Sequence, residues 1–463
     1  MKVLGAQRPT PEQLKIIGDT RIGTEIIRGA AGSGKTTTAL LRLRNLSDMF
    51  RARHTRLSIK HPVRTLLLTY NRTLCGYVEA LAEEQAAKGG GVKIEVSTYA
   101  QWAYRLAGQP PICGNRAPHV RDLADHEGLT LSKDFLDSEV EYVLGRFQPE
   151  YAGYLDAERT GRGLSPRIER ATRERILRVI GRYKSRLADR GELDWEDLPQ
   201  AVLGVASQNY EIVVIDEAQD FSANQLRSIQ CHVASASSLT LVVDTAQRLY
   251  PRGYTWAEAG LDARRASFYR LQHNHRNTIQ IATFARGIIS GVAIDDDGTL
   301  PDLTKATRNG PKPSVFRGRY LSQLDFAIDH IRSNVDLAEE TVAFLKPLGG
   351  RWFNFVRTRL SREGLLYEEI TRTREWPRNS TNVVLSTMHS AKGLEFDHVI
   401  ILGLSDEVTP HGQEDDDDQL STLRRLLAMA VARARKTVII GFKEDQASSL
   451  VSFFEDGSFD EYE

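Results

Sequence analysis

Apolar residues gather along this chain in short runs that do not alternate with polar positions. Ile212–Ile215 and Val399–Leu402 are two examples. Such runs are typical of strands buried on both faces, as in a parallel sheet covered by helices. A first block of predicted strands comprises Glu25–Arg28, Thr65–Tyr70, Lys93–Ser97, Tyr210–Ile215 and Leu239–Val243. A second block comprises Ser314–Arg317, Thr341–Leu345, Val383–Ser386, His398–Leu402 and Thr437–Phe442.

Helical stretches separate these strands, so each block is predicted to be a doubly wound α/β unit. Between Thr98 and Asp194 the pattern becomes helical and rich in arginine, which indicates a helical insertion into the first unit. The predicted divisions are residues 1–97 and 193–267 for the first unit, 98–192 for the insertion and 268–463 for the second unit.

Composition excludes several classes of protein. The 463 residues include 61 basic and 61 acidic side chains, so any binding of nucleic acid must come from local patches. Cys75, Cys113 and Cys231 form no C-x-x-C pair, which disfavours structural zinc and indicates a reducing compartment. The sequence has no secretion segment and no apolar run of membrane-spanning length, so we expect a cytoplasmic protein without a membrane partner.

A glycine-rich loop between a predicted strand and a predicted helix is the strongest chemical signal. It fills every fixed position of the pattern G-x-x-x-x-G-K-[ST], whose backbone N–H groups cradle a polyphosphate. Lys35 is expected to reach the β- and γ-phosphates, and the Thr36 hydroxyl to ligate Mg²⁺. The alternative is a glycine turn before an ordinary helix. The expected nucleotide-binding residues here are Gly29, Ala30, Ala31, Gly32, Ser33, Gly34, Lys35, Thr36 and Thr37.

Two carboxylates follow the buried strand Ile212–Ile215 directly. Ligands of open α/β sheets bind at the carboxyl ends of the strands, which is where Asp216 and Glu217 are expected. Asp216 is predicted to hold Mg²⁺, and Glu217 to polarise the water that attacks the γ-phosphate. The alternative is an acidic helix start.

Further motifs follow one another in a characteristic order. Together they resemble those of the UvrD/Rep type of superfamily 1 helicases. The matching segments are Thr10–Gln13 (the Q motif), Leu66–Leu74 and Val96–Tyr99 (the strand-binding motifs), Leu193–Leu198, Asp244–Tyr250 (motif III), Leu271–Thr278 (motif IV), Ser386–Phe396 (motif V) and Arg424–Arg435 (motif VI).

The resemblance implies two RecA-like motor domains with ATP in the cleft between them, and 3′→5′ movement on single-stranded DNA. It implies that Gln13 reads the adenine and that Gln247 senses the γ-phosphate. Arg276 and Arg433 would be arginine fingers that stabilise charge in the transition state. Tyr250, Gly393 and Glu395 are also expected at the nucleotide.

Contacts to nucleic acid are expected from the strand-binding motifs and from motif V. Aromatic rings stack on bases regardless of sequence, but any single ring has core packing as its alternative. The arginine-rich insertion is either a phosphate-screening patch or a solvated helix face paired with acidic residues. The expected contact residues are Tyr70, Asn71, Thr98, Tyr99, Trp256, Thr387 and His389.

The chain departs from the family in two places. Motif VI has Ala428, Ala432 and Thr422-Leu423 where an aromatic, a threonine and an acidic pair are usual. The large insertion between motifs IV and V, which governs unwinding, is absent or vestigial. The main hypothesis is an ATP-dependent single-stranded DNA translocase or helicase, with RNA left open. The alternatives are an ATPase subunit beside a nuclease or other partner, as in bacterial anti-phage defence, and a small-molecule kinase.

Overall fold

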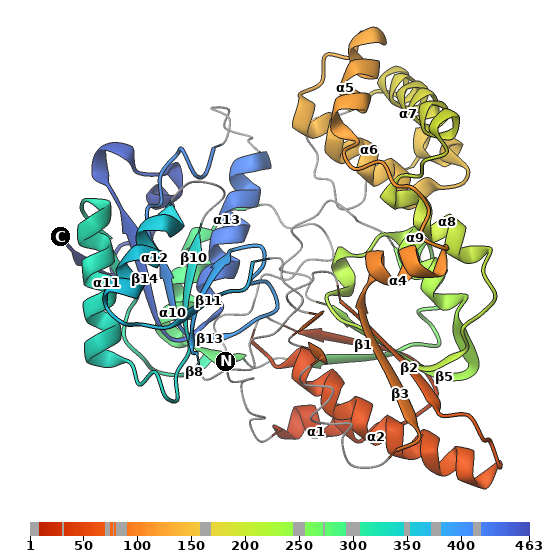
Figure 1. Ribbon diagram of the computed structural model, residues 1–463, viewed down its shortest axis with the longest axis horizontal. Coiled ribbons are helices and arrows are strands. Elements are labelled where there is room, and N and C mark those ends of the chain that lie inside the picture. The colour runs from red at the N-terminus through yellow and green to blue at the C-terminus, as the bar shows by residue number, and fades with distance from the viewer. Residues whose placement is uncertain are drawn as a thin grey trace.

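The computed structural model describes residues 9–29, 32–69, 75–76, 78–79, 90–157, 168–243, 255–271, 274–292, 306–346, 352–371, 381–410 and 418–463. It contains two parallel sheets, each covered by helices (Figure 1). The first has the order β3-β2-β4-β5-β1-β6 and the second β11-β12-β10-β13-β14-β9-β15.

The strands of the first sheet are β1 (Gly23–Gly29), β2 (Val63–Thr69), β3 (Val92–Thr98), β4 (Tyr210–Ile215), β5 (Val233–Val243) and β6 (Ser267–Leu271). Those of the second are β9 (Ser314–Arg317), β10 (Val342–Lys346), β11 (Tyr367–Glu369), β12 (Val383–Thr387), β13 (Phe396–Ile401), β14 (Ala434–Phe442) and β15 (Asp460–Tyr462). A separate pair, β7 (Asn274–Thr278) and β8 (Ala306–Arg308), lies between the two sheets in sequence. The two predicted RecA-like α/β units are confirmed, and every predicted strand overlaps one of these.

Helices cover both faces of the first sheet. Successive strand residues point to opposite faces, so Ile26 and Ile27 belong to different hydrophobic clusters. Ile27 packs with the cluster that includes α2 (Lys35–Arg56), and α1 (Pro11–Ile17) lies beside that helix. Ile26 packs with the cluster of α4 (Tyr99–Leu106), α8 (Leu198–Leu203) and α9 (Ala223–Gln230).

The second sheet is covered in the same way. Helices α10 (Ile279–Ile288) and α13 (Asp418–Val431) pack on one face, and α11 (Tyr320–Asn334) and α12 (Trp352–Arg362) on the other. One hydrophobic cluster includes residues of both α2 and α13, so the two units share part of their core. Short 3₁₀ helices also occur in the described residues: η1 (Tyr151–Leu155), η2 (Trp195–Asp197), η3 (Ala218–Asp220), η6 (Glu444–Gln446) and η7 (Ser449–Phe453).

Between β3 and β4 the chain forms a further helical group, α5 (Ala117–His126), α6 (Lys133–Phe147) and α7 (Arg170–Arg190). These helices have a hydrophobic cluster of their own and stand beyond α4, α8 and α9 in Figure 1. A division at residue 267 would cut β6 from the first sheet, because β6 pairs with β1 from Glu25↔Ser267 to Gly29↔Leu271. We therefore propose that the first unit ends after Leu271. Within the described residues, every helix is too short or too polar to cross a lipid bilayer.

A buried ion pair fixes α2 to the first sheet. Arg42 Nη2 lies 2.6 Å from Glu25 Oε1, and both side chains are almost fully buried. Arg42 also donates to the Asp19 carbonyl at 2.9 Å and to Thr240 Oγ1 at 2.6 Å. Burial raises the pKa of Glu25 to about 7, although Arg42 favours the charged carboxylate. The pair therefore costs desolvation but leaves neither charge alone.

We expect Arg42→Ala to lower the free energy of unfolding by about 3–5 kcal/mol, because it leaves Glu25 buried without its cation. Arg44→Ala changes an exposed residue of the same helix and should cost less than about 0.5 kcal/mol. Urea denaturation followed by tryptophan fluorescence compares the two variants. Equal losses would contradict the importance of the buried pair.

Candidate functional site

The predicted phosphate loop folds tightly between β1 and α2. Gly32 and Gly34 have φ angles of 80° and 76°, in the left-handed region that favours glycine. A Cβ at Gly32 would lie 2.8 Å from Arg276 Cβ and would collide with Asn274 Oδ1. The loop is therefore pressed against β7, and only glycine fits there.

Lys35 and Thr36, the first two residues of α2, make hydrogen bonds to different parts of the first unit. Lys35 Nζ donates to the Gly29 carbonyl at 2.8 Å, across the loop. Thr36 Oγ1 donates to Asp216 Oδ2 at 2.9 Å, which joins α2 to the carboxyl end of β4. Burial, and next the charge of Glu217, raise the pKa of Asp216 to about 7, against the opposing effects of Thr36 and Lys35.

These groups fit a polyphosphate with a divalent cation. The Ser33 hydroxyl and Arg276 Nε and Nη1 are buried with no hydrogen-bond partner among the described residues, so donors remain for an anion. Thr36 and Asp216 supply oxygen ligands of the kind that Mg²⁺ prefers. A cation there would also favour the ionised form of Asp216, which burial disfavours.

Glu217 adopts a left-handed backbone conformation, with φ at 54°, which is rare outside glycine. Gln219 Nε2 donates to its carboxylate, and the carboxylate lies 3.9 Å from Lys392 Nζ of the second unit. Lys392 Nζ also donates to Asp220 Oδ2 at 2.5 Å. The sequence places Lys392 in motif V, but it gave no expectation of these contacts to Asp220 and Glu217. The close match of the segment to motif V was the one sign that Lys392 could matter.

Arg276 and Arg433 approach the same carboxylate. Arg276 Nη2 donates to Glu395 Oε1. Arg433 is buried and donates to the carbonyls of Met429 and Leu394 at 3.2 and 3.4 Å. Burial acts to raise the pKa of Glu395, but the charges of Arg276, Arg435 and Arg433 bring it below its ordinary value. Of these arginines, Arg276 lies directly against the phosphate loop at Gly32.

Gln13 is tied to the loop itself. Its Nε2 donates to the Ser33 carbonyl at 3.0 Å, and its Oε1 accepts from the Thr10 N–H at 2.9 Å. Recognition of adenine by Gln13 stays a prediction. Thr37 lies in the first turn of α2, and Gly393 has a φ of 82° between Lys392 and Glu395. Several expected site residues lie outside the described residues: Ala30, Ala31, Tyr70, Asn71, Gln247 and Tyr250.

The described candidates for nucleic-acid contact divide into core and surface positions. Tyr99 is buried, with its hydroxyl 2.8 Å from Ser228 Oγ and its ring against Trp102 and Phe221, so it offers no face for a base in this structure. Thr98 caps α4 by accepting from the Gln101 N–H.

The other candidates are more accessible. Trp256 is partly buried, and the Arg28 guanidinium lies 5.7 Å from its ring centroid. Thr387 donates to Ser390 Oγ at 2.9 Å, at the end of β12, and His389 is half-buried next to it.

The arginines of α7 are largely paired within the insertion. Arg178 and Arg182 each lie 3.0 Å from Glu127, and Arg186 lies 2.8 Å from Asp122. These contacts favour the interpretation of α7 as a solvated, ion-paired face.

Residues 10–259, more than half of the chain, match the UvrD/REP helicase N-terminal domain. The chain belongs to the UvrD/REP helicase family. Residues 361–445 match the UvrD-like helicase C-terminal domain, so both units of this family member are covered in part.

Two curated relatives match a shorter stretch. The ATP-dependent DNA helicase Rep of Buchnera aphidicola subsp. Schizaphis graminum is 34% identical over 77 residues, which are 17% of this chain and 11% of Rep. The ATP-dependent DNA helicase PcrA of Staphylococcus aureus strain Mu50 is 41% identical over 61 residues, 12% of this chain and 8% of PcrA. The aligned segments thus span only a small part of either relative.

A solved structure, the C-terminal domain of a possible DNA helicase from Lactobacillus plantarum WCFS1, is similar over 41% of this chain and 99% of its own. Its sequence identity is 20% and its TM-score 0.30.

Proposed function

We propose that this protein is an ATP-driven motor that moves 3′→5′ along single-stranded DNA. One observation carries the proposal: Arg276, paired with Glu395 of the second unit, lies against the phosphate loop of the first. A nucleotide in that loop would contact both units, so its hydrolysis would change how they are held together. The direction of movement rests on the resemblance to the family.

Each residue of the site has a role in this proposal. Lys35 and the loop N–H groups bind the phosphates, and Ser33 offers its hydroxyl to them. Thr36 and Asp216 would hold Mg²⁺, which when bound neutralises charge on the phosphate oxygens. Glu217 orients the attacking water and accepts its proton. Arg276 and Arg433 stabilise the charge that develops in the transition state.

The second unit limits what the motor would do alone. The described parts of residues 277–386 are occupied by α10 to α12 and by strands β8 to β12. Apart from the pair β7 and β8, these elements belong to the second sheet and its helices, so the described residues here form no separate domain that could engage a duplex junction. This favours a second candidate function, in which the motor is the ATPase subunit of a complex and its partner supplies the junction-splitting or nuclease activity. Bacterial anti-phage systems are one such setting.

We expect Lys35→Ala to abolish ATP turnover, because it removes the cation that meets the phosphates. Glu217→Gln should retain ATP binding but lose at least ~100-fold in rate, because no base remains for the water. Steady-state hydrolysis and binding of a fluorescent ATP analogue separate the two effects. Asp48→Asn, an exposed change on α2, is the control. Turnover by Glu217→Gln at the rate of the unaltered protein would contradict the role of Glu217.

Alanine at Arg276 or Arg433 should slow turnover far more than it weakens ATP binding, because these cations act on transition-state charge. Arg286→Ala, which removes an exposed arginine of α10, should change neither quantity. Weaker binding with normal turnover at saturating ATP would instead make the two arginines ordinary binding residues.

Single-stranded DNA should stimulate ATP hydrolysis, whereas the monomer should unwind a 3′-tailed duplex only weakly. Binding and stimulation should both fall as salt rises, since phosphate contacts release counterions. The measurement compares ATPase rates with single-stranded DNA, duplex and RNA, and then unwinding at concentrations where the protein is monomeric. Fast, processive unwinding by the monomer would contradict the subunit hypothesis.

A further inference from the structure

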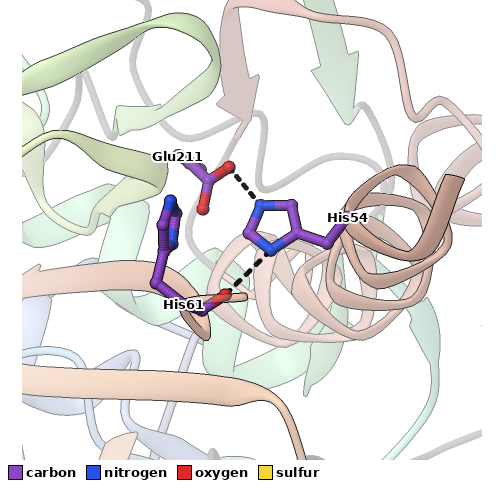
Figure 2. Close-up of side chains that lie close together, drawn as sticks. All are labelled: His54, His61 and Glu211. Carbon is purple, nitrogen blue, oxygen red and sulfur yellow. Dashed lines mark hydrogen bonds and ion pairs between the residues drawn. The ribbon is translucent and has the colours of Figure 1, made fainter. Parts of the chain in front are cut away.

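A cluster of two histidines and a glutamate lies at the end of the first sheet opposite the phosphate loop. His54 is in the last turn of α2, His61 lies in the segment before β2, and Glu211 is in β4 (Figure 2). The site already described uses the carboxyl ends of β1 and β4, whereas this cluster lies where β2 and β4 begin. His54 and Glu211 are buried, and His61 is exposed.

Both ring nitrogens of His54 face oxygen acceptors. His54 Nδ1 lies 3.1 Å from the His61 carbonyl oxygen, and Nε2 lies 2.6 Å from Glu211 Oε1 (Figure 2). A neutral imidazole carries a single proton, so one of these contacts would set a lone pair against an oxygen. The arrangement is therefore satisfied by one further proton, on His54 or on the Glu211 carboxyl, or by a neutral ring whose Nε2 binds a cation shared with Glu211.

Backbone groups orient all three side chains, as is usual around metal ligands. The His61 carbonyl fixes the ring of His54, and the Arg64 N–H donates to Glu211 Oε2 at 3.3 Å. His61 Nδ1 lies 3.1 Å from the Pro62 carbonyl, which assigns the proton to Nδ1 and leaves a lone pair on Nε2. Glu211 Oε1 and the two rings thus offer one oxygen and two nitrogens.

The spacing suits a small cation. One ligand atom from each residue can be chosen so that all lie within 4.8 Å of one another. Ligands of tetrahedral Zn²⁺ at their usual bond lengths stand about 3.4 Å apart, so His61 would move inward, while His54 Nε2 and Glu211 Oε1, which are 2.6 Å apart, would separate. The exposed ring of His61 can make that movement without disturbing the core.

We propose that His54, His61 and Glu211 bind one divalent transition-metal ion of the Zn²⁺ class, with water completing the shell. Imidazole nitrogens with one carboxylate select such ions over Mg²⁺ and Ca²⁺, which prefer an all-oxygen shell. The ion would join the end of α2 and the segment before β2 to β4. Because α2 begins at Lys35, the ion would hold the far end of the helix that carries the phosphate loop.

The test uses the full chain, stripped with a chelator and kept free of nucleotide. Zn²⁺ should bind with one equivalent at this site and, at about 100-fold excess over Kd, raise Tm by on the order of 5 °C. Co²⁺ should give the visible absorption of a tetrahedral nitrogen and oxygen shell. His61→Ala should weaken binding of either ion at least tenfold while leaving the Tm of the metal-free protein unchanged, because His61 is exposed.

Matched variants separate this site from other ligands. His126→Ala removes another exposed histidine, and Cys231→Ser an exposed thiol. Asp216→Asn alters the expected Mg²⁺ site. Each should retain the Zn²⁺-dependent rise in Tm and the cobalt spectrum. If Zn²⁺ does not raise Tm, or if His61→Ala responds like the unaltered protein, the cluster is only a hydrogen-bonded histidine–carboxyl pair and the proposal fails. Loss of the effect in one of the other variants would also overturn it.

Discussion

The structure depends on charged side chains that are buried where the two α/β units meet. Lys392 of the second unit is 3% exposed and Asp220 of the first is fully buried, yet the two are joined at 2.5 Å. Removing either partner would deprive the other buried charge of its nearest counter-charge, which is more costly than keeping the pair. The ion pair therefore sets which relative positions of the units are accessible, and shared apolar packing reinforces the same arrangement.

The same constraint explains why this junction suits a nucleotide. Two guanidinium nitrogens of Arg276 are buried with no hydrogen-bond partner among the described residues, while the third donates to Glu395. Asp216 is hydrogen-bonded to Thr36 after the same loop, and burial raises its pKa because it disfavours the charged carboxylate. The oxygens of a bound polyphosphate would pair with Arg276, and its cation would pair with the carboxylate of Asp216. Gain and loss of such a ligand would change the electrostatic balance between the units, which is what a motor cycle requires.

The sequence predicted the fold well because its strands are buried on both faces and leave unbroken apolar runs. The edge strand β6 escaped that analysis, since Phe268 and Arg270 alternate with better-covered residues and are exposed. The phosphate loop and the acidic pair were predictable because their chemistry is local. Lys392 with Asp220, and His54 with Glu211, are separated by more than a hundred residues, so only the fold brings them together. The sequence around Tyr99 does not indicate whether its ring packs in the core or is exposed to a strand of DNA.

The unusual composition of motif VI acquires a physical explanation in the structure. Ala428 and Ala432 replace larger residues that the family uses around Arg433, and both are buried. Asn277, which is fully buried and lies in motif IV, donates through Nδ2 to the carbonyls of Ala432 at 3.0 Å and Ala434 at 2.6 Å. The Arg433 carbonyl accepts from the Phe396 N–H at 3.0 Å. The backbone on both sides of Arg433 is thus fixed by hydrogen bonds to its carbonyl groups. These hydrogen bonds hold Arg433 in position although Ala428 and Ala432 provide little side-chain support.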